Sequence, residues 1–154
     1  LSMLKKLIAE DLVKSMKEKN QKRVSTLRLI NSSIKDLEIS LRSQSDSNDI
    51  NDNDIINILS KMIKQRKESA EIFKKGNRED LYGNEIIEIK IIEEFMPKQL
   101  SEDEIISIID GLILEHEIKD MKGMGIIMGL LKKDYSGQMD LGLASKLIKD
   151  KINT

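Results

Sequence analysis

The sequence predicts an all-α protein, and three observations lead to this prediction. Apolar residues recur every three or four positions over most of the chain, which is the spacing of one face of a helix. Pro97 is the only proline, and the helix-favouring residues Lys, Glu, Leu and Ile are abundant. We expect an N-terminal bundle of about four helices followed by a small C-terminal three-helix bundle.

The N-terminal bundle is expected to occupy residues 3–96. Its helices should cover about residues 3–19, 24–41, 55–75 and 78–95. A polar loop at 43–54 separates the second helix from the third, and Asp52 or Asn53 could cap the third helix. The last of the four is apolar on much of its circumference, so it is expected to be the most buried.

The boundary between the two domains is expected at Met96–Pro97, because the residue before proline disfavours the α conformation. Ser101 and Glu104 then form the pattern of a capping box, which starts a new helix. The second domain is therefore expected at 97–154, with its last helices at about 124–134 and 140–152. Gly125 and Gly129 predict close packing in the first of these two, since glycine permits close approach.

Several classes of chemistry are excluded by composition. The chain has no cysteine, which rules out disulfides, thiolate metal sites and cysteine nucleophiles. His116 is the only histidine, and no phosphate-binding loop motif is present. We expect no metal, no cofactor and no catalysis by the chain alone. No apolar run is long enough to span a bilayer, so the prediction is a cytoplasmic protein without membrane partners.

Charge is unevenly distributed, although the net charge is only −1. Residues 1–42 have a net charge of +5, residues 101–121 of −6, and residues 122–154 of +3. This pattern indicates either ordinary solvated helix faces or a chain with a positively charged binding surface near its C-terminus.

Three segments resemble the free-standing YqeY proteins. They are Lys64–Ala70 with Phe73–Leu81, Phe95–Ser101, and Met124–Leu130 with Tyr135–Asp140. The similarity runs in the same order along the whole chain from about Met3. The family often has basic residues where this chain has Ile126 and Ile127, and often an Arg near Gln138, so the positive patch is weaker here.

The resemblance implies a function connected with tRNA. The family shares its helical region with the C-terminal tail of GatB, a subunit of the glutamine-dependent tRNA amidotransferase, in which that tail approaches tRNA. Its family-level label is therefore carbon–nitrogen ligase with glutamine as amido-N-donor, but the catalytic parts of that enzyme have no counterpart here. We expect a tRNA-binding module or an accessory of a tRNA-dependent enzyme. The alternative is a helical protein–protein interaction module without nucleic acid.

Two groups of residues are candidates for contact with tRNA phosphates. The first group lies in the last domain and consists of Lys132, Lys133, Ser136, Gln138, Lys146 and Lys149. The second is a basic surface made by Lys64, Arg66, Lys67, Lys74, Lys75 and Arg78. Acidic residues are interspersed in the second group, so ion pairs within the helix are the favoured interpretation there.

Overall fold

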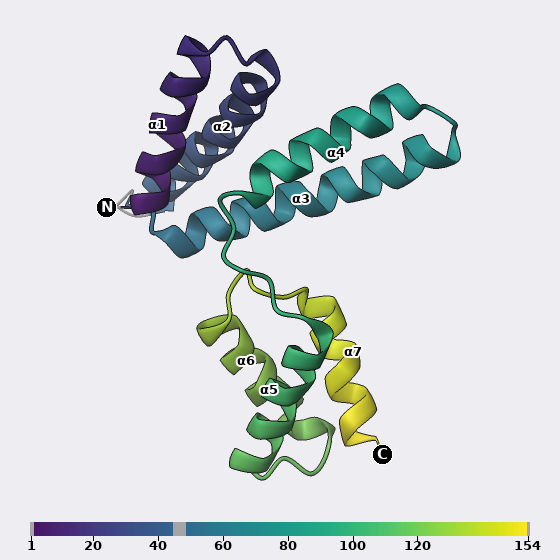
Figure 1. The fold of residues 1–154 in the computed structure, drawn as a ribbon. Helices are drawn as coiled ribbons and strands as arrows, with labels where there is room; N and C mark the ends of the chain where they lie inside the picture. Colours follow the sequence, from purple (N-terminus) through teal and green to yellow (C-terminus); the bar gives the residue numbers. More distant parts are fainter. Residues whose placement is uncertain (1, 45–48, 154) are drawn as a thin grey trace. The chain divides into compact units, whose positions relative to one another are not determined.

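The computed structural model describes residues 2–44 and 49–153, and all regular structure in these two ranges is helical. The helices are α1 (Met3–Lys17), α2 (Gln21–Gln44), α3 (Asp52–Lys75), α4 (Glu79–Glu93), α5 (Glu102–Glu115), η1 (Met121–Gly123, a short 3₁₀ helix), α6 (Met124–Asp134) and α7 (Leu141–Ile152) (Figure 1). The all-α prediction is confirmed. Internal contacts divide the chain into two compact units, Leu1–Met96 and Pro97–Thr154.

Both ends of the predicted polar loop at 43–54 are helical, because α2 continues to Gln44 and α3 begins at Asp52. Residues 45–48 lie outside the described residues. The cap of α3 is Asn51, not Asp52 or Asn53. The Asn51 side chain accepts a hydrogen bond from the Asp54 N–H at 2.9 Å, and the Asp54 carboxylate accepts one from the Asn51 N–H at 3.0 Å. This reciprocal pair satisfies two helix-start donors and fixes the first residue of α3.

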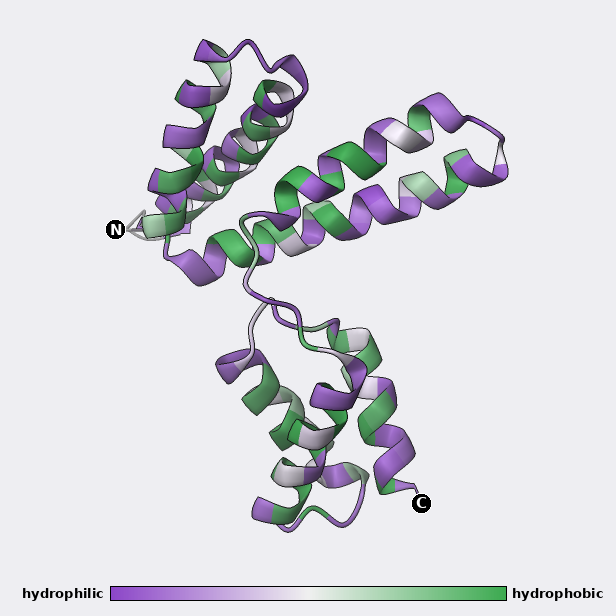
Figure 2. Cartoon of the chain, in the orientation of Figure 1, coloured by the Kyte–Doolittle hydropathy of each residue, from purple (hydrophilic) through white to green (hydrophobic). Residues whose placement is uncertain are grey.

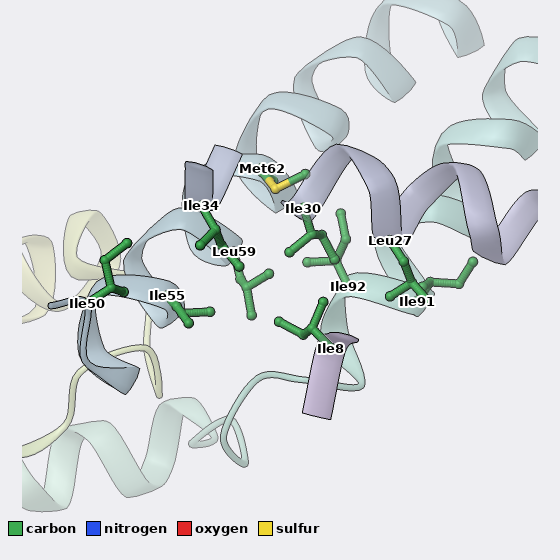
Figure 3. Packing of buried hydrophobic residues seen from close by; sticks show 10 residues of the cluster. All are labelled: Ile8, Leu27, Ile30, Ile34, Ile50, Ile55, Leu59, Met62, Ile91 and Ile92. Atoms are coloured by element: carbon green, nitrogen blue, oxygen red, sulfur yellow. The ribbon is translucent and has the colours of Figure 1, made fainter. Parts of the chain in front are cut away.

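One aliphatic cluster forms the core of the first unit (Figure 3). It consists of Ile8, Leu27, Ile30, Ile34, Ile50, Ile55, Leu59, Met62, Ile91 and Ile92. These side chains come from α1, α2, α3 and α4 and from Ile50, which lies just before α3. Because most of them are completely buried, this cluster supplies the main hydrophobic stabilisation of the unit.

The four N-terminal helices do not pack together over their full lengths. The core cluster includes α3 only as far as Met62, and beyond it α3 and α4 continue as an antiparallel hairpin (Figure 1). In Figure 2, α4 is hydrophobic over much of its length, whereas the outer half of α3 is mostly hydrophilic. The expectation that the fourth helix is the most buried is confirmed, because α4 has the smallest share of exposed residues among the four helices, although Ile87 is 46% exposed. An apolar helix that extends past the core leaves part of its apolar surface in solvent.

Arg23 connects three helices of the first unit. Its Nε donates to Asp11 Oδ1 of α1 at 2.8 Å, and its Nη1 donates to Glu94 Oε2, just after α4, at 2.6 Å. The hydrogen bond from Arg23 lowers the pKa of Asp11 below its usual value, with burial opposing this shift. The guanidinium group thus acts as a fork between two carboxylates, a geometry that lysine cannot reproduce.

A second aliphatic cluster forms the core of the C-terminal unit. It consists of Ile105, Ile109, Ile127, Leu131, Met139, Ala144 and Ile148. Ser101 caps α5 by accepting a hydrogen bond from the Glu104 N–H at 3.2 Å. The predicted return bond to the Ser101 backbone is replaced, because the Glu104 carboxylate instead accepts from the Ser101 hydroxyl at 3.2 Å.

The glycines of α6 are not close-packing positions. An added Cβ would meet nothing within 4 Å at Gly125 or Gly129, and both residues are exposed. The prediction of close packing there is therefore wrong. The tight position is Gly123, which is buried at the end of η1.

Candidate nucleic-acid interface

Lys132 and Lys133 lie in the last turn of α6, and both are exposed. The buried residues Ile127 and Leu131 hold the opposite side of this helix in the core. Because a helix carries partial negative charge at its C-terminal end, two lysines are stabilised in this position. The sequence thus places two exposed lysines in the same turn of the C-terminal unit.

The turn after α6 is held in place by several hydrogen bonds. Gly137 adopts a positive φ of 74°, which favours glycine. The Leu100 N–H donates to the Gln138 carbonyl at 2.8 Å, and the Gln99 side chain donates to the Gly137 carbonyl at 2.6 Å. The two polar candidates in this turn, Ser136 and Gln138, are half-buried. Their backbone is therefore positioned by the residues just before α5.

Lys146 and Lys149 lie on the exposed side of α7, opposite the buried residues Ala144 and Ile148. Asp140 caps this helix by accepting a hydrogen bond from the Gly142 N–H at 2.7 Å. The turn joins the end of α6 to the start of α7. Lys146 and Lys149 are therefore displaced from that junction, by about 8 and 12 Å along the axis of α7. The four lysines form an extended series, not a compact cluster.

None of these four lysines has a carboxylate partner within 4.0 Å among residues 2–44 and 49–153. Lys122, which was not predicted from the sequence, adds a fifth exposed ammonium group in η1, two residues before α6 begins. The sequence pattern that could have identified Lys122 is a helical spacing of three or four residues, shared by Lys122, Gly125, Gly129 and Lys132. Two glycines without side chains thus separate lysines at the two ends of that pattern.

The second basic surface differs from its prediction. Arg66 donates to Glu88 of α4 at 2.9 Å and to the Met62 carbonyl at 3.2 Å, so it joins two helices. Arg78 pairs with Asp80 at 3.3 Å, and this is the one local pair of the group in the part of the chain that the structure describes. The remaining lysines, Lys64, Lys67, Lys74 and Lys75, are exposed. The prediction of ion pairs within the helix is therefore mostly wrong, because the available partner of Arg66 lies on the neighbouring helix.

Glu85 lies beside this ion pair and has a buried oxygen without a hydrogen-bond partner, Oε2. Burial raises the pKa of Glu85, and the charge of Glu88 raises it further, while Arg66 and Lys22 oppose the shift. When folding raises the pKa of a carboxyl group, the free energy of unfolding falls as the pH rises through that pKa. At neutral pH, the charged Glu85 side chain therefore destabilises the first unit.

We expect Glu85→Gln to raise the free energy of unfolding at pH 7 by about 0.5–1 kcal/mol, because the neutral amide avoids the burial of a charge. The gain should disappear at acidic pH, where Glu85 itself is protonated. The matched control is Glu88→Gln, which removes the partner of Arg66 and should lower stability at pH 7. Urea unfolding of both variants at the two pH values checks this. A variant that is equally stabilised at both pH values would contradict it.

No cluster of three or more His, Asp or Glu side chains suited to holding a metal ion occurs in the described ranges. Within the same ranges, no helix combines the length and the apolar composition needed to cross a bilayer. His116 caps the end of α5 and is exposed. The class of protein defined by this geometry is a two-unit helical protein with exposed lysines on α6 and α7.

The chain matches the family model described as Yqey-like protein over residues 5–152. The chain therefore belongs to the YqeY-like family, as the sequence resemblance predicted. It is 36% identical over 110 residues to Altered inheritance of mitochondria protein 41, mitochondrial, of Lachancea thermotolerans, covering 70% of this chain and 57% of that protein. The protein of the same name from Kluyveromyces lactis is 38% identical over 88 residues, covering 57% of this chain and 45% of that protein.

An uncharacterized protein of Schizosaccharomyces pombe is 33% identical over 98 residues, which are 64% of this chain and 76% of that protein. The chain spans about half the length of the two yeast relatives named as protein 41. Their names contradict the predicted cytoplasmic location, because both are named as mitochondrial proteins. The prediction rested on the absence of cysteine and of a long apolar run, and neither feature distinguishes the cytoplasm from the interior of a mitochondrion.

Proposed function

We propose that the C-terminal unit binds tRNA weakly through the lysines of α6 and α7, as part of an accessory to a tRNA-dependent enzyme. The observation that carries the proposal is the series of exposed lysines without carboxylate partners, held on two helices that share one core. Ammonium groups that are not neutralised within the protein are available for phosphates. The family resembles the tail of GatB that approaches tRNA, and this resemblance supports a tRNA-binding role for the same part of the chain.

The expected affinity is modest. The lysines contact phosphates rather than base edges, and such contacts carry no sequence information. With four or five of them, the affinity should lie in the range of nonspecific binding, with a dissociation constant of roughly 10⁻⁴–10⁻⁶ M. Ile126, which is 52% exposed where the family often has a basic residue, favours the weak end of this range.

Replacing Lys132, Lys133, Lys146 and Lys149 together by Glu is expected to abolish tRNA binding. For the unchanged chain, the logarithm of the affinity should fall with the logarithm of salt concentration with a slope of about −3 to −4, as four or five released counterions require. Titration of labelled tRNA by fluorescence anisotropy at several salt concentrations measures both quantities. The four substitutions lie on exposed positions, where most changes have little effect on stability.

The matched control replaces Lys64, Lys67, Lys74 and Lys75 by Glu. It changes the net charge by the same amount on the other unit, and it should leave most of the binding intact. Equal losses in the two quadruple variants would show that bulk charge, not the α6–α7 surface, determines binding. Absence of binding at every salt concentration would instead favour the protein–protein interaction module.

We propose a binding role and not amidotransferase activity for the isolated chain. The family-level label of carbon–nitrogen ligase needs a nucleophile that releases ammonia from glutamine, and the sequence shows neither a cysteine nor a Ser-Lys arrangement to provide it. Any contribution to amidation would then come through positioning tRNA for a separate catalytic subunit.

A further inference from the structure

A shallow groove of about 370 Å³ runs between α3 and α4 on the outer part of their hairpin. Its floor is apolar and its rim is charged. The floor includes Tyr82, Ile86 and Ile89, and the rim includes Lys67, Glu71, Lys90 and Glu93. Because this part of the hairpin lies beyond the core cluster, two helices pack here with an apolar side left open.

The rim charges have no ion-pair partner within 4.0 Å among the residues that the structure describes. Lys67 and Glu71 are one helical turn apart on α3 and alternate in sign. Alternating signs disfavour a polyanion as the occupant, since Glu71 would repel phosphates. They favour an occupant whose charges alternate in the opposite order.

Two contacts across the hairpin fix which residues of α3 and α4 lie at the same level. Arg66 is bonded to Glu88 at 2.9 Å, and the Lys74 ammonium lies 5.8 Å from the centre of the Tyr82 ring. A residue of α3 and a residue of α4 therefore lie at the same level along the hairpin axis when their two residue numbers add up to about 155. Ser69 of α3 and Ile86 of α4 form one such level.

Part of the rim is symmetric about this level, but Glu93 is not, because the residue equally far on the other side of Ile86 is Glu79. Lys67 and Glu71 lie equally far on either side of Ser69, and Tyr82 and Lys90 lie equally far on either side of Ile86. A two-fold axis that crosses the hairpin at this level would place Lys67 opposite Glu71 of a second copy, and Glu71 opposite its Lys67. The same rotation brings Lys90 of each copy to the Tyr82 ring of the other.

We propose that a second copy of this chain occupies the groove, so that two α3–α4 hairpins associate face to face and antiparallel. The four helices would complete a bundle around the two Ile86 side chains, with two Lys67–Glu71 ion pairs and two Lys90–Tyr82 cation–π contacts. Such self-complementary pairing is what an isologous interface requires. At each end of the interface, Lys64 of one copy lies at the level of Lys74 of the other. The repulsion between these two positive charges keeps the dimer weak.

The test is sedimentation equilibrium of the full chain over a roughly hundred-fold range of concentration, as a weak association requires. Lys67→Glu and Glu71→Lys, each alone, should raise the dimer dissociation constant by about tenfold or more, because each places two like-charged pairs in contact. The double variant with both substitutions restores opposite charges and should return to within about threefold of the unchanged chain. Lys61→Glu, which is exposed on α3 and does not line the groove, is the matched control and should have no effect.

Two results would overturn the proposal. The first is a chain that stays monomeric at every concentration, which would leave the groove to a different protein. The second is a dimer whose dissociation constant is the same in the single variants and in the double variant, which would place the interface elsewhere. Circular dichroism of each variant verifies that the helices are retained, so that a loss of dimer is not a loss of fold.

Discussion

Ile92→Ala is expected to destabilise the first unit by about 2–5 kcal/mol and to leave the second unit unchanged. Ile92 is fully buried in α4 and belongs to the N-terminal core cluster. Truncation to alanine removes three side-chain carbons and leaves a cavity that α1, α2 and α3 can only partly fill. The two clusters share no residue, so the lost contacts belong to one unit.

The measurement is hydrogen exchange followed by mass spectrometry, which assigns protection to each part of the chain. Ile109→Ala is the matched control, because Ile109 is fully buried in the C-terminal cluster. It should accelerate exchange in residues 97–153 and leave residues 2–96 protected. If either variant accelerated exchange equally throughout the chain, the two units would unfold as one, and the predicted boundary at Met96–Pro97 would be wrong as a folding boundary.

Helical periodicity, together with the helix-breaking and helix-capping residues, predicted the elements of this fold well. The buried series Leu27, Ile30 and Ile34 has the spacing of a helix face, and α2 presents it to the core. The helix starts were less predictable, because several residues compete for each cap. Asp52 and Asn53 both suit a cap, but only Asn51 completes the reciprocal pair with Asp54. Periodicity also could not show where α3 and α4 leave the core, since that depends on how α1 and α2 pack against them.

The candidate site was predicted only in part. The exposure of Lys132 and Lys149 follows from their helical phase relative to Leu131 and Ile148, so the sequence was sufficient for them. The distances between these lysines depend on how α6 and α7 are joined, which the sequence does not define. The partner of Arg66 is likewise a residue 22 positions away on the facing helix, and only the fold brings Glu88 to it.

Gly123→Ala is expected to destabilise the C-terminal unit by about 1–3 kcal/mol, as overpacking of a filled core does. A Cβ at this position would lie 2.5 Å from Cγ2 of Ile118, 2.6 Å from its Cδ1 and 3.3 Å from its Cβ. Rotation of the Ile118 side chain can move Cγ2 and Cδ1 but not Cβ, so the 3.3 Å contact must also open by a few tenths of an ångström. The φ of Gly123 is −80°, and the effect is therefore steric and not conformational.

Two further variants separate this steric effect from a general intolerance of alanine in α6. Gly125→Ala should be neutral or stabilising by up to about 1 kcal/mol, because its Cβ meets nothing within 4 Å and alanine favours a helix. Combining Gly123→Ala with Ile118→Ala should be less destabilising than the two single changes added together, since alanine at 118 removes the contacts at 2.5 and 2.6 Å and keeps only the 3.3 Å contact with Cβ. Urea unfolding of the four variants measures these differences. Additive losses in the double variant would show that Gly123 is required for a reason other than contact with Ile118.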